Sequence, residues 1–250
     1  MVYLQPQKTF YYEKIAKIAV IGDIHGTNKF LDCYDDILKN HNDVAYIFVL
    51  GDHFDPYEEI PFEDMIRRYN EFTIRSKTDP RIISLLGNHD LATYVIPDEV
   101  TNRTEYNAQR IKILANLIAP NLKDSYIVYR LGNYLISHAG VSNTWIRFCG
   151  RKGYDFKKLQ KKGWTPEALA EICAYSTQDR SGWGNHTSQG PTWIRPMALA
   201  KDPYNDYNQI VGHSMTQTEA IEQIQMTEKS SIWLTDNCGK SECLILEVEV

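Results

Sequence analysis

The chain has 250 residues, a length at which one domain can bury a large apolar core. Apolar residues make up 43% and charged residues 24%, which excludes a disordered or fibrous protein. The net charge of −5 argues against a general nucleic-acid binder, whose affinity would depend on a basic surface.

The N-terminus and the cysteines indicate the cellular compartment of the protein. Residues 1–17 contain no apolar stretch typical of a signal peptide, and no segment approaches the ~20 apolar residues of a membrane span. The five cysteines are odd in number and form no CxxC pair, which favours reduced thiols over disulfides or a zinc site. We therefore expect a soluble, cytoplasmic protein with no membrane partner. Nothing in the sequence indicates an oligomeric state.

In chain order, the apolar pattern predicts strands that alternate with helices. Short buried strands are predicted in the first half of the chain over 17–21, 44–50 and 81–86. Amphipathic helices are predicted after them, over 28–40, 63–75 and 102–119. The first strand–helix–strand segment should be a right-handed βαβ unit with parallel strands. We expect Pro120 to close the third helix, because proline cannot continue the backbone hydrogen bonds.

Two hairpins and a capped helix are predicted in the second half. Gly132-Asn133 is typical of a tight turn, and residues 237–240 provide a second turn near the C-terminus. The predicted strand pairs are 126–130 with 134–137, and 232–235 with 244–250. Thr165 and Pro166 are suited to the cap and the first turn of a helix.

The domain organisation follows from the absence of repeats and linkers. No low-complexity segment divides the chain, so we expect a single domain over 1–250. The basic stretch 147–162 has weak apolar patterning and is interpreted as a surface insertion. The wider segment 147–184 is the predicted insertion or cap.

Polar motifs follow the ends of predicted strands. They are Gly22-Asp23-Ile24-His25-Gly26, Gly51-Asp52-His53-Phe54-Asp55, Gly87-Asn88-His89-Asp90, Ser137-His138-Ala139-Gly140 and Gly212-His213. Ligands bind beyond the carboxyl ends of strands in open α/β sheets, so these side chains should converge on one crevice. We expect the glycines to allow sharp turns there. Mixed carboxylate, imidazole and amide groups suit Mn²⁺, Fe or Zn²⁺ better than Ca²⁺. The sequence thus predicts a two-metal hydrolytic centre.

The order of these motifs resembles the calcineurin-like metallophosphoesterase superfamily. The last motif, Gly212-His213-Ser214-Met215, has no second histidine two positions on, which resembles the phosphoprotein-phosphatase (serine/threonine phosphatase) branch. Segments 190–196 and 235–239 resemble further parts of that branch. The resemblance covers about residues 17–250 and is weakest over 147–184. It implies an α/β fold, the four-layer α/β/β/α metallophosphoesterase sandwich with mixed sheets.

The resemblance also implies a role for each motif residue. The metal ligands would be Asp23, His25, Asp52, Asn88, His138 and His213. Asp52 would bridge two divalent cations, with Mn²⁺ expected and Fe or Zn²⁺ as alternatives. A hydroxide shared by the cations would attack phosphorus in line, without a phospho-enzyme. His89 would protonate the leaving oxygen with support from Asp55, and Arg195 would bind the phosphoryl oxygens.

One position departs from the branch and bears on the substrate. The branch usually has Arg then Gly after the second aspartate, whereas Pro56 follows Asp55 here. His53, Arg103 and Arg110 are candidates to replace that phosphate-binding arginine. The expected substrates are phosphomonoesters, phosphoserine and phosphothreonine included. Nucleotides, dinucleoside polyphosphates and nucleic-acid or cyclic phosphodiesters are the alternatives, so nucleic acid enters only as a substrate.

Each motif has a simpler explanation when it is taken alone. Asn88 could belong to an ordinary turn, and His138 could be a satisfied core histidine. Asp90 is interpreted as a turn or hydrogen-bonding residue behind the site, and Asp236 as a structural turn residue.

The alternative function of another class is a non-catalytic binding protein of the same fold. Its expected signature is the loss of metal ligands, and every ligand position is occupied in this chain.

Overall fold

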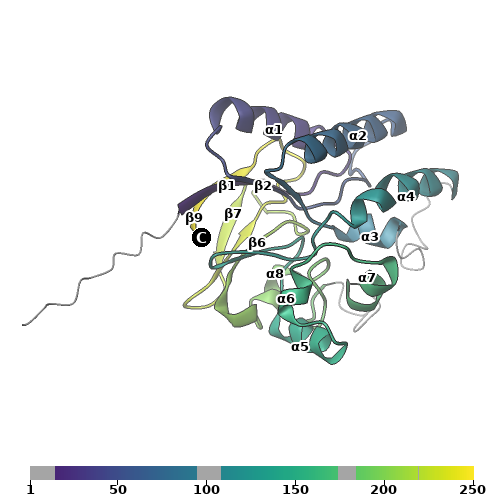
Figure 1. Cartoon of the computed structure of the whole chain (residues 1–250). Helices are drawn as coiled ribbons and strands as arrows, with labels where there is room; N and C mark the ends of the chain where they lie inside the picture. Colours follow the sequence, from purple (N-terminus) through teal and green to yellow (C-terminus); the bar gives the residue numbers. More distant parts are fainter. Residues whose placement is uncertain (1–14, 95–107, 174–183, 219) are drawn as a thin grey trace, which may run out of the picture.

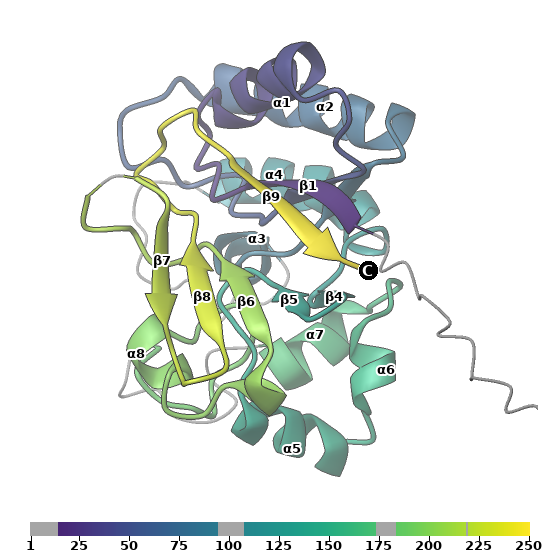
Figure 2. The same cartoon turned by 90° about the vertical axis from the view of Figure 1, so that its left-hand side faces the viewer.

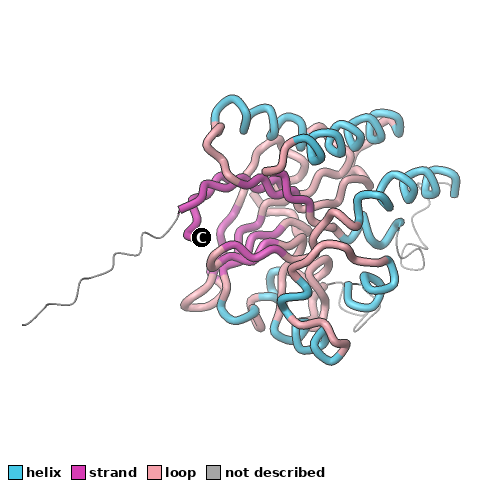
Figure 3. The backbone as a smooth tube through the Cα atoms, viewed as in Figure 1, coloured by secondary structure: helices cyan, strands magenta, loops and turns pink. Residues whose placement is uncertain are grey.

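Two β-sheets stack face to face between outer layers of helices (Figures 1 and 3). The computed structural model describes residues 15–94, 108–173, 184–218 and 220–250. This arrangement confirms the predicted α/β/β/α sandwich with mixed sheets. No helix within those ranges is long and apolar enough to cross a membrane.

The first sheet contains the predicted βαβ unit. Its strands are ordered β3-β2-β1-β9 and comprise β1 (Ile15–Ile21), β2 (Tyr46–Val49), β3 (Ile82–Ser84) and β9 (Leu244–Glu249). Strands β1, β2 and β3 are parallel, which confirms the predicted orientation, and β9 runs antiparallel to β1. Helices α1 (Lys29–Asn40) and α2 (Phe62–Thr78) connect these strands and cover the outer face.

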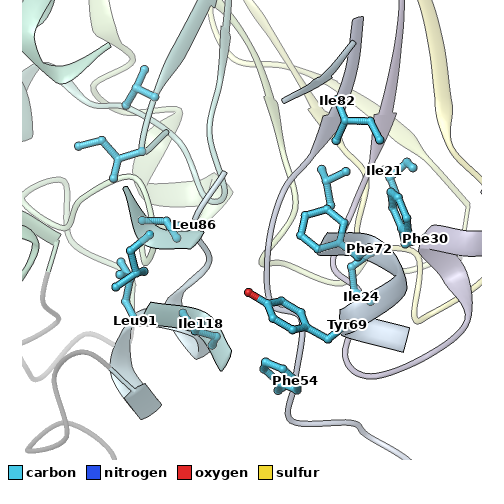
Figure 4. Packing of buried hydrophobic residues seen from close by; sticks show 14 of the residues in the cluster. Ile21, Ile24, Phe30, Phe54, Tyr69, Phe72, Ile82, Leu86, Leu91 and Ile118 are labelled. Atoms are coloured by element: carbon cyan, nitrogen blue, oxygen red, sulfur yellow. The ribbon is translucent and has the colours of Figure 1, made fainter. Parts of the chain in front are cut away.

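Burial on both faces explains the uninterrupted apolar runs of this sheet. In β1, Ile18 and Val20 belong to the core cluster between the sheets, whereas Ala19 and Ile21 belong to the cluster beneath the helices. On the helical side, Phe72 of α2 packs edge-on against Phe30 of α1, with the ring centroids 5.0 Å apart (Figure 4).

The second sheet is ordered β4-β5-β6-β8-β7. Its strands are β4 (Tyr129–Leu131), β5 (Tyr134–Ile136), β6 (Asn208–Val211), β7 (Glu222–Gln225) and β8 (Ser231–Leu234). Strands β5, β6 and β8 are parallel, and β4 and β7 pair antiparallel at the edges. Leu131 pairs with Tyr134 across Gly132-Asn133, which confirms the first predicted hairpin.

The remaining helices pack around the sheets. They are α3 (Asn88–Tyr94), α4 (Ala108–Leu122), α5 (Asn143–Arg151), α6 (Phe156–Leu159), α7 (Pro166–Cys173) and α8 (Pro196–Leu199), followed by a 3₁₀ turn at Tyr204–Asp206. Helices α5 to α8 lie on the side of the second sheet (Figure 2). The predicted start of the third helix falls in 102–107, outside the described residues. Thr165 caps α7 by accepting a hydrogen bond from the Ala168 backbone N–H at 3.3 Å.

Most residues of the basic stretch 147–162 are exposed, as predicted for a surface segment, but parts of it are helical and two of its residues belong to the core. Cys149 and Leu159 are fully buried in the cluster that also contains Trp145. Apolar residues inserted among charged ones make a short helix hard to distinguish from a solvated loop. The interpretation of 147–184 as an insertion or cap relative to other proteins stays a prediction.

The structure corrects two predictions, one about a hairpin and one about the end of a helix. Strands β8 and β9 form no hairpin, because β9 leaves the second sheet and completes the edge of the first beside β1. Pro120 lies inside α4 and is exposed, so its missing N–H does not end the helix. The last turn is anchored by Leu122, which is 5% exposed, and its burial stabilises the turn beyond the proline.

Candidate functional site

The carboxyl ends of the parallel strands carry most of the predicted site residues. Asp23, His138 and His213 each lie two positions beyond the last residue of β1, β5 and β6. Asp52 follows β2, and Asn88 begins α3 after β3. Backbone hydrogen bonds join neighbouring loops, including His25 N–H to the Asp52 carbonyl at 2.6 Å and Gly212 N–H to the His138 carbonyl at 2.8 Å. Between the two sheets, His213 N–H donates to the Asp23 carboxylate at 3.0 Å, so the loops form one connected edge.

The first group of converging side chains is Asp23, His25 and Asp52, whose ligand atoms lie within 4.8 Å of one another. The Nε2 of His25 is 3.8 Å from an oxygen of each carboxylate. Its Nδ1 faces the backbone carbonyls of Phe54 at 3.1 Å and Asp55 at 2.8 Å. The carbonyls fix the ring so that Nε2 is directed at the carboxylates, and this buried nitrogen has no hydrogen-bond partner. An unpartnered imidazole nitrogen beside two carboxylates fits a divalent metal ion.

The second group is Asn88, His138 and His213. The Oδ1 of Asn88 lies 2.8 Å from Nε2 of His138 and 2.9 Å from Nδ1 of His213. The buried Nε2 of His213 has no hydrogen-bond partner. Asp52 lies between the two groups, since its Oδ2 is 3.4 Å from His138 Nε2 and 3.8 Å from His25 Nε2. A carboxylate in this position fits a ligand shared by two metals.

The protonation of the histidines follows from these contacts. Burial disfavours a charged His138, but Asp52 and Asp23 outweigh it and raise its pKa to about 10. Its Nδ1 donates to the Leu50 carbonyl at 2.9 Å and its Nε2 faces an amide oxygen, as an imidazolium requires. Burial likewise opposes the charge of His25, and the same carboxylates raise its pKa to about 9. A metal at this site therefore has to displace protons.

His213 is the exception among these histidines. Burial, followed by the positive charge of His138, lowers its pKa to about 3. It is therefore neutral without a metal. Arg195 is among the charges that lower this pKa, which puts its guanidinium in the electrostatic neighbourhood of the second group.

Asp90 holds two of the loops together from behind. Its carboxylate accepts hydrogen bonds from the backbone N–H groups of Asp52 at 2.8 Å, His53 at 2.9 Å and Gly87 at 3.1 Å. This agrees with its interpretation as a hydrogen-bonding residue behind the site.

Glycine is required before the ligand residues for two reasons, and the sequence predicted only the first, a sharp turn. Gly51 does turn the chain, with φ +95°. Gly87 and Gly212 have no positive φ; a Cβ on Gly87 would overlap the Asp52 carboxylate, and one on Gly212 would overlap that of Asp23. Close approach of a carboxylate to the backbone thus requires glycine there.

His89 and Asp55 form a pair at the rim of the site. The Nδ1 of His89 lies 2.7 Å from Oδ2 of Asp55, and its Nε2 is 4.0 Å from Asp52. The His89 side chain is 14% exposed, whereas that of Asp52 is 2% exposed. Nε2 can therefore meet a substrate from solvent while Asp55 fixes the ring.

The candidates to replace the arginine missing at Pro56 fall in different places. His53 is buried against the rings of Phe72 and Tyr69, with centroids 4.3 Å and 5.1 Å away, so it does not line the site. Arg103 lies outside the described residues. The guanidinium of Arg110 lies 4.8 Å from the ring centroid of Phe62. It lines a groove of about 410 Å³ with residues 56–60 and 65, directly beside the position of the missing arginine.

Sequence reasoning missed two residues of the site. The Tyr57 ring lies 4.3 Å from the ring of His25, and no pattern in the sequence indicated this contact. Lys29 is fully buried, and its Nζ donates to Oδ1 of Asn237 at 2.8 Å. The i, i+4 spacing of Lys29 with Cys33 and Ile37 on the buried face of α1 was the signal that could have found it.

The sequence model of the calcineurin-like phosphoesterase family matches this chain over residues 16–215. The chain therefore belongs to the calcineurin-like phosphoesterase family. No curated protein matches it.

Solved structures with low identity resemble the chain. One is a protein serine/threonine phosphatase from Saccharomyces cerevisiae with similarity to human phosphatase PP5, at 13% identity and a TM-score of 0.49, over 94% of this chain and 80% of that chain. Another is described provisionally as a diadenosine tetraphosphatase, at 13% identity and a TM-score of 0.45, over 94% and 93%. A third is a metallophosphoesterase from Sphaerobacter thermophilus, at 15% identity and a TM-score of 0.34, over 88% and 75%. The comparisons establish the family and not a particular substrate.

Gly87→Ala tests the close approach behind the site. The added methyl group would displace the Asp52 carboxylate, so we expect a loss of stability of about 1–3 kcal/mol and a roughly tenfold or greater loss of Mn²⁺ affinity. Urea unfolding and calorimetric titration measure the two effects. Gly150→Ala is the matched control, because nothing lies within 4 Å of its Cβ position in α5. Unchanged Mn²⁺ affinity in Gly87→Ala would contradict the packing described here.

Metal binding should release protons at pH 7.5. His25 and His138, with pKa values of about 9 and 10, are protonated at that pH in the metal-free protein. We expect release of about two protons from these histidines on saturation with Mn²⁺, in addition to any from metal-bound water, and weaker binding as the pH falls. Calorimetric titrations in buffers of different ionisation enthalpy measure this number. An observed enthalpy that does not depend on the buffer would contradict the assignment.

Proposed function

We propose that this protein is a metal-dependent phosphoesterase that hydrolyses phosphate esters directly, without a phospho-enzyme. The arrangement that carries the proposal is a buried carboxylate–imidazole cluster with the partly exposed His89, held by the buried Asp55, at its rim. The proposed substrates are phosphomonoesters, with phosphoserine and phosphothreonine among them. A cytoplasmic location belongs to the same proposal.

The residues that would hold two divalent cations are Asp23, His25, Asp52, Asn88, His138 and His213. Carboxylate, imidazole and amide ligands support Mn²⁺, with Fe or Zn²⁺ as alternatives. Two bound cations supply a water molecule that is deprotonated near neutral pH and offset the negative charge of the phosphate. The central position of the Asp52 Oδ2, between His25 and His138, supports its role as the shared ligand.

The rim residues would act on the ester itself. His89 would donate a proton from Nε2 to the leaving oxygen, because its Nδ1 is held by Asp55 at 2.7 Å. Arg195 is exposed and electrostatically coupled to His213, which supports a role in binding the phosphoryl oxygens. Arg110 lines the groove beside Pro56. Among the described residues, it is the candidate for a second phosphate contact.

A substrate panel tests the reaction class. The protein, supplied with Mn²⁺, is assayed on a monoester, a diester, a phosphopeptide and a dinucleoside polyphosphate. We expect the highest kcat/KM on a monoester. A preference for the dinucleoside polyphosphate or the diester would select one of the alternatives. Activity on none of the four, with two metals bound, would favour a non-catalytic binding protein.

His89→Ala tests the general acid. The variant should keep its metals and lose about 10²–10⁴ in kcat on alkyl phosphates, whose leaving oxygens need a proton. The loss should be much smaller on an activated aryl phosphate, whose leaving group departs as an anion. Metal content is measured on the same samples. An equal loss on both substrates would contradict proton donation by His89.

A further inference from the structure

A sixth strand end reaches the candidate site and carries a residue with no role so far. Strand β8 lies parallel to β6 and ends at Leu234, and Asp236 follows two positions later. This is the same offset that places Asp23 after β1 and His213 after β6. The topology therefore delivers the Asp236 carboxylate to the edge that holds the metal-ligand candidates.

The side chain of Asp236 is fully buried, and neither of its carboxylate oxygens has a hydrogen-bond partner. The backbone around it is satisfied. Thr235 N–H donates to the Val211 carbonyl at 2.8 Å, and Thr216 N–H donates to the Asp236 carbonyl at 2.9 Å. A buried carboxylate without a partner costs free energy, so a purely structural role in the turn does not explain it. Two unpartnered oxygens instead indicate a group that binds them.

The charges that act on Asp236 are those of the first metal-ligand group and of the buried Lys29. They come from Asp23, Lys29, His25 and Asp52. A Cβ on Gly22 would overlap the Thr235 carbonyl, so the β8 loop lies directly against the loop that carries Asp23.

Lys29 does not satisfy this carboxylate. Its ammonium donates to Oδ1 of Asn237 at 2.8 Å and to the Thr235 carbonyl at 3.4 Å. Among the described residues, no ion pair within 4.0 Å joins Lys29 to Asp236. Lys29 therefore contributes charge from a distance and leaves both oxygens open.

We propose that Asp236 is a further positioning residue of the metal centre. Its carboxylate adds negative charge beside the first cation and accepts hydrogen bonds from the hydration shell of that cation. It acts beyond the direct ligands, because the compact cluster consists of Asp23, His25 and Asp52 without it. This inference rests on the proposed function, since it requires a metal in the first group.

Asp236→Asn in the full chain tests this role, with Mn²⁺ alone as the probe. The amide keeps the shape but removes the charge and one acceptor, so we expect the affinity of the first Mn²⁺ to fall about 10–100-fold by calorimetric titration. Circular dichroism at the same temperature verifies that the variant is folded. The melting temperature without metal should stay equal or rise, because an unpaired buried charge has been removed.

Asp43→Asn is the matched control, since it removes the same charge from an exposed carboxylate that pairs with Lys17. Its Mn²⁺ affinity should equal that of the unaltered protein. If Asp236→Asn does not fold, the double variant Lys29→Met/Asp236→Asn removes both buried charges and should bind Mn²⁺ more weakly than Lys29→Met alone, which is its reference.

The outcomes separate this inference from the proposed function. If the unaltered protein binds no Mn²⁺, the proposed function fails. If the unaltered protein and the Asp236 variant bind Mn²⁺ with equal affinity, only the role of Asp236 is overturned. Equal affinity together with a lower metal-free melting temperature would make Asp236 a distant counter-charge for Lys29.

Discussion

The rest of the site depends on two buried carboxylates that lie at the edge shared by the two sheets. The carboxylates of Asp23 and Asp52 are 1% exposed, and each accepts hydrogen bonds from backbone N–H groups of neighbouring loops. Buried carboxylates this close together are stable only beside positive charge. Without metals, His25 and His138 supply it as imidazolium groups. Divalent cations would replace those protons and provide the stronger compensation.

The backbone is shaped to hold these carboxylates in place. His25, Asp52, Asp55 and His213 have φ values between 45° and 62°, a region that costs most residues free energy. The strain is maintained because the loops hydrogen-bond to one another and because Asp90 fixes three N–H groups at once. A site built in this way is rigid before any ligand arrives, which is what electrostatic stabilisation of a reaction requires.

Much of this could be predicted because the signals are local. A buried strand followed by glycine and a polar ligand is visible within a few residues, and the parallel order of the strands places such ligands at one edge. The partners of a strand are not local. The pairing of β9 with β1 joins residues more than 220 positions apart, and a nearby turn sequence favoured the wrong hairpin. The same holds for the Tyr57 ring beside His25 and for His53 among aromatic rings, since only tertiary packing determines them.

We propose that Asp52 is a ligand shared by two metal ions. Anomalous diffraction from crystals grown with Mn²⁺ tests it most directly. Two peaks should flank Asp52, one beside Asp23 and His25 and the other beside Asn88, His138 and His213. A single peak, or peaks that do not contact Asp52, would contradict a dinuclear centre.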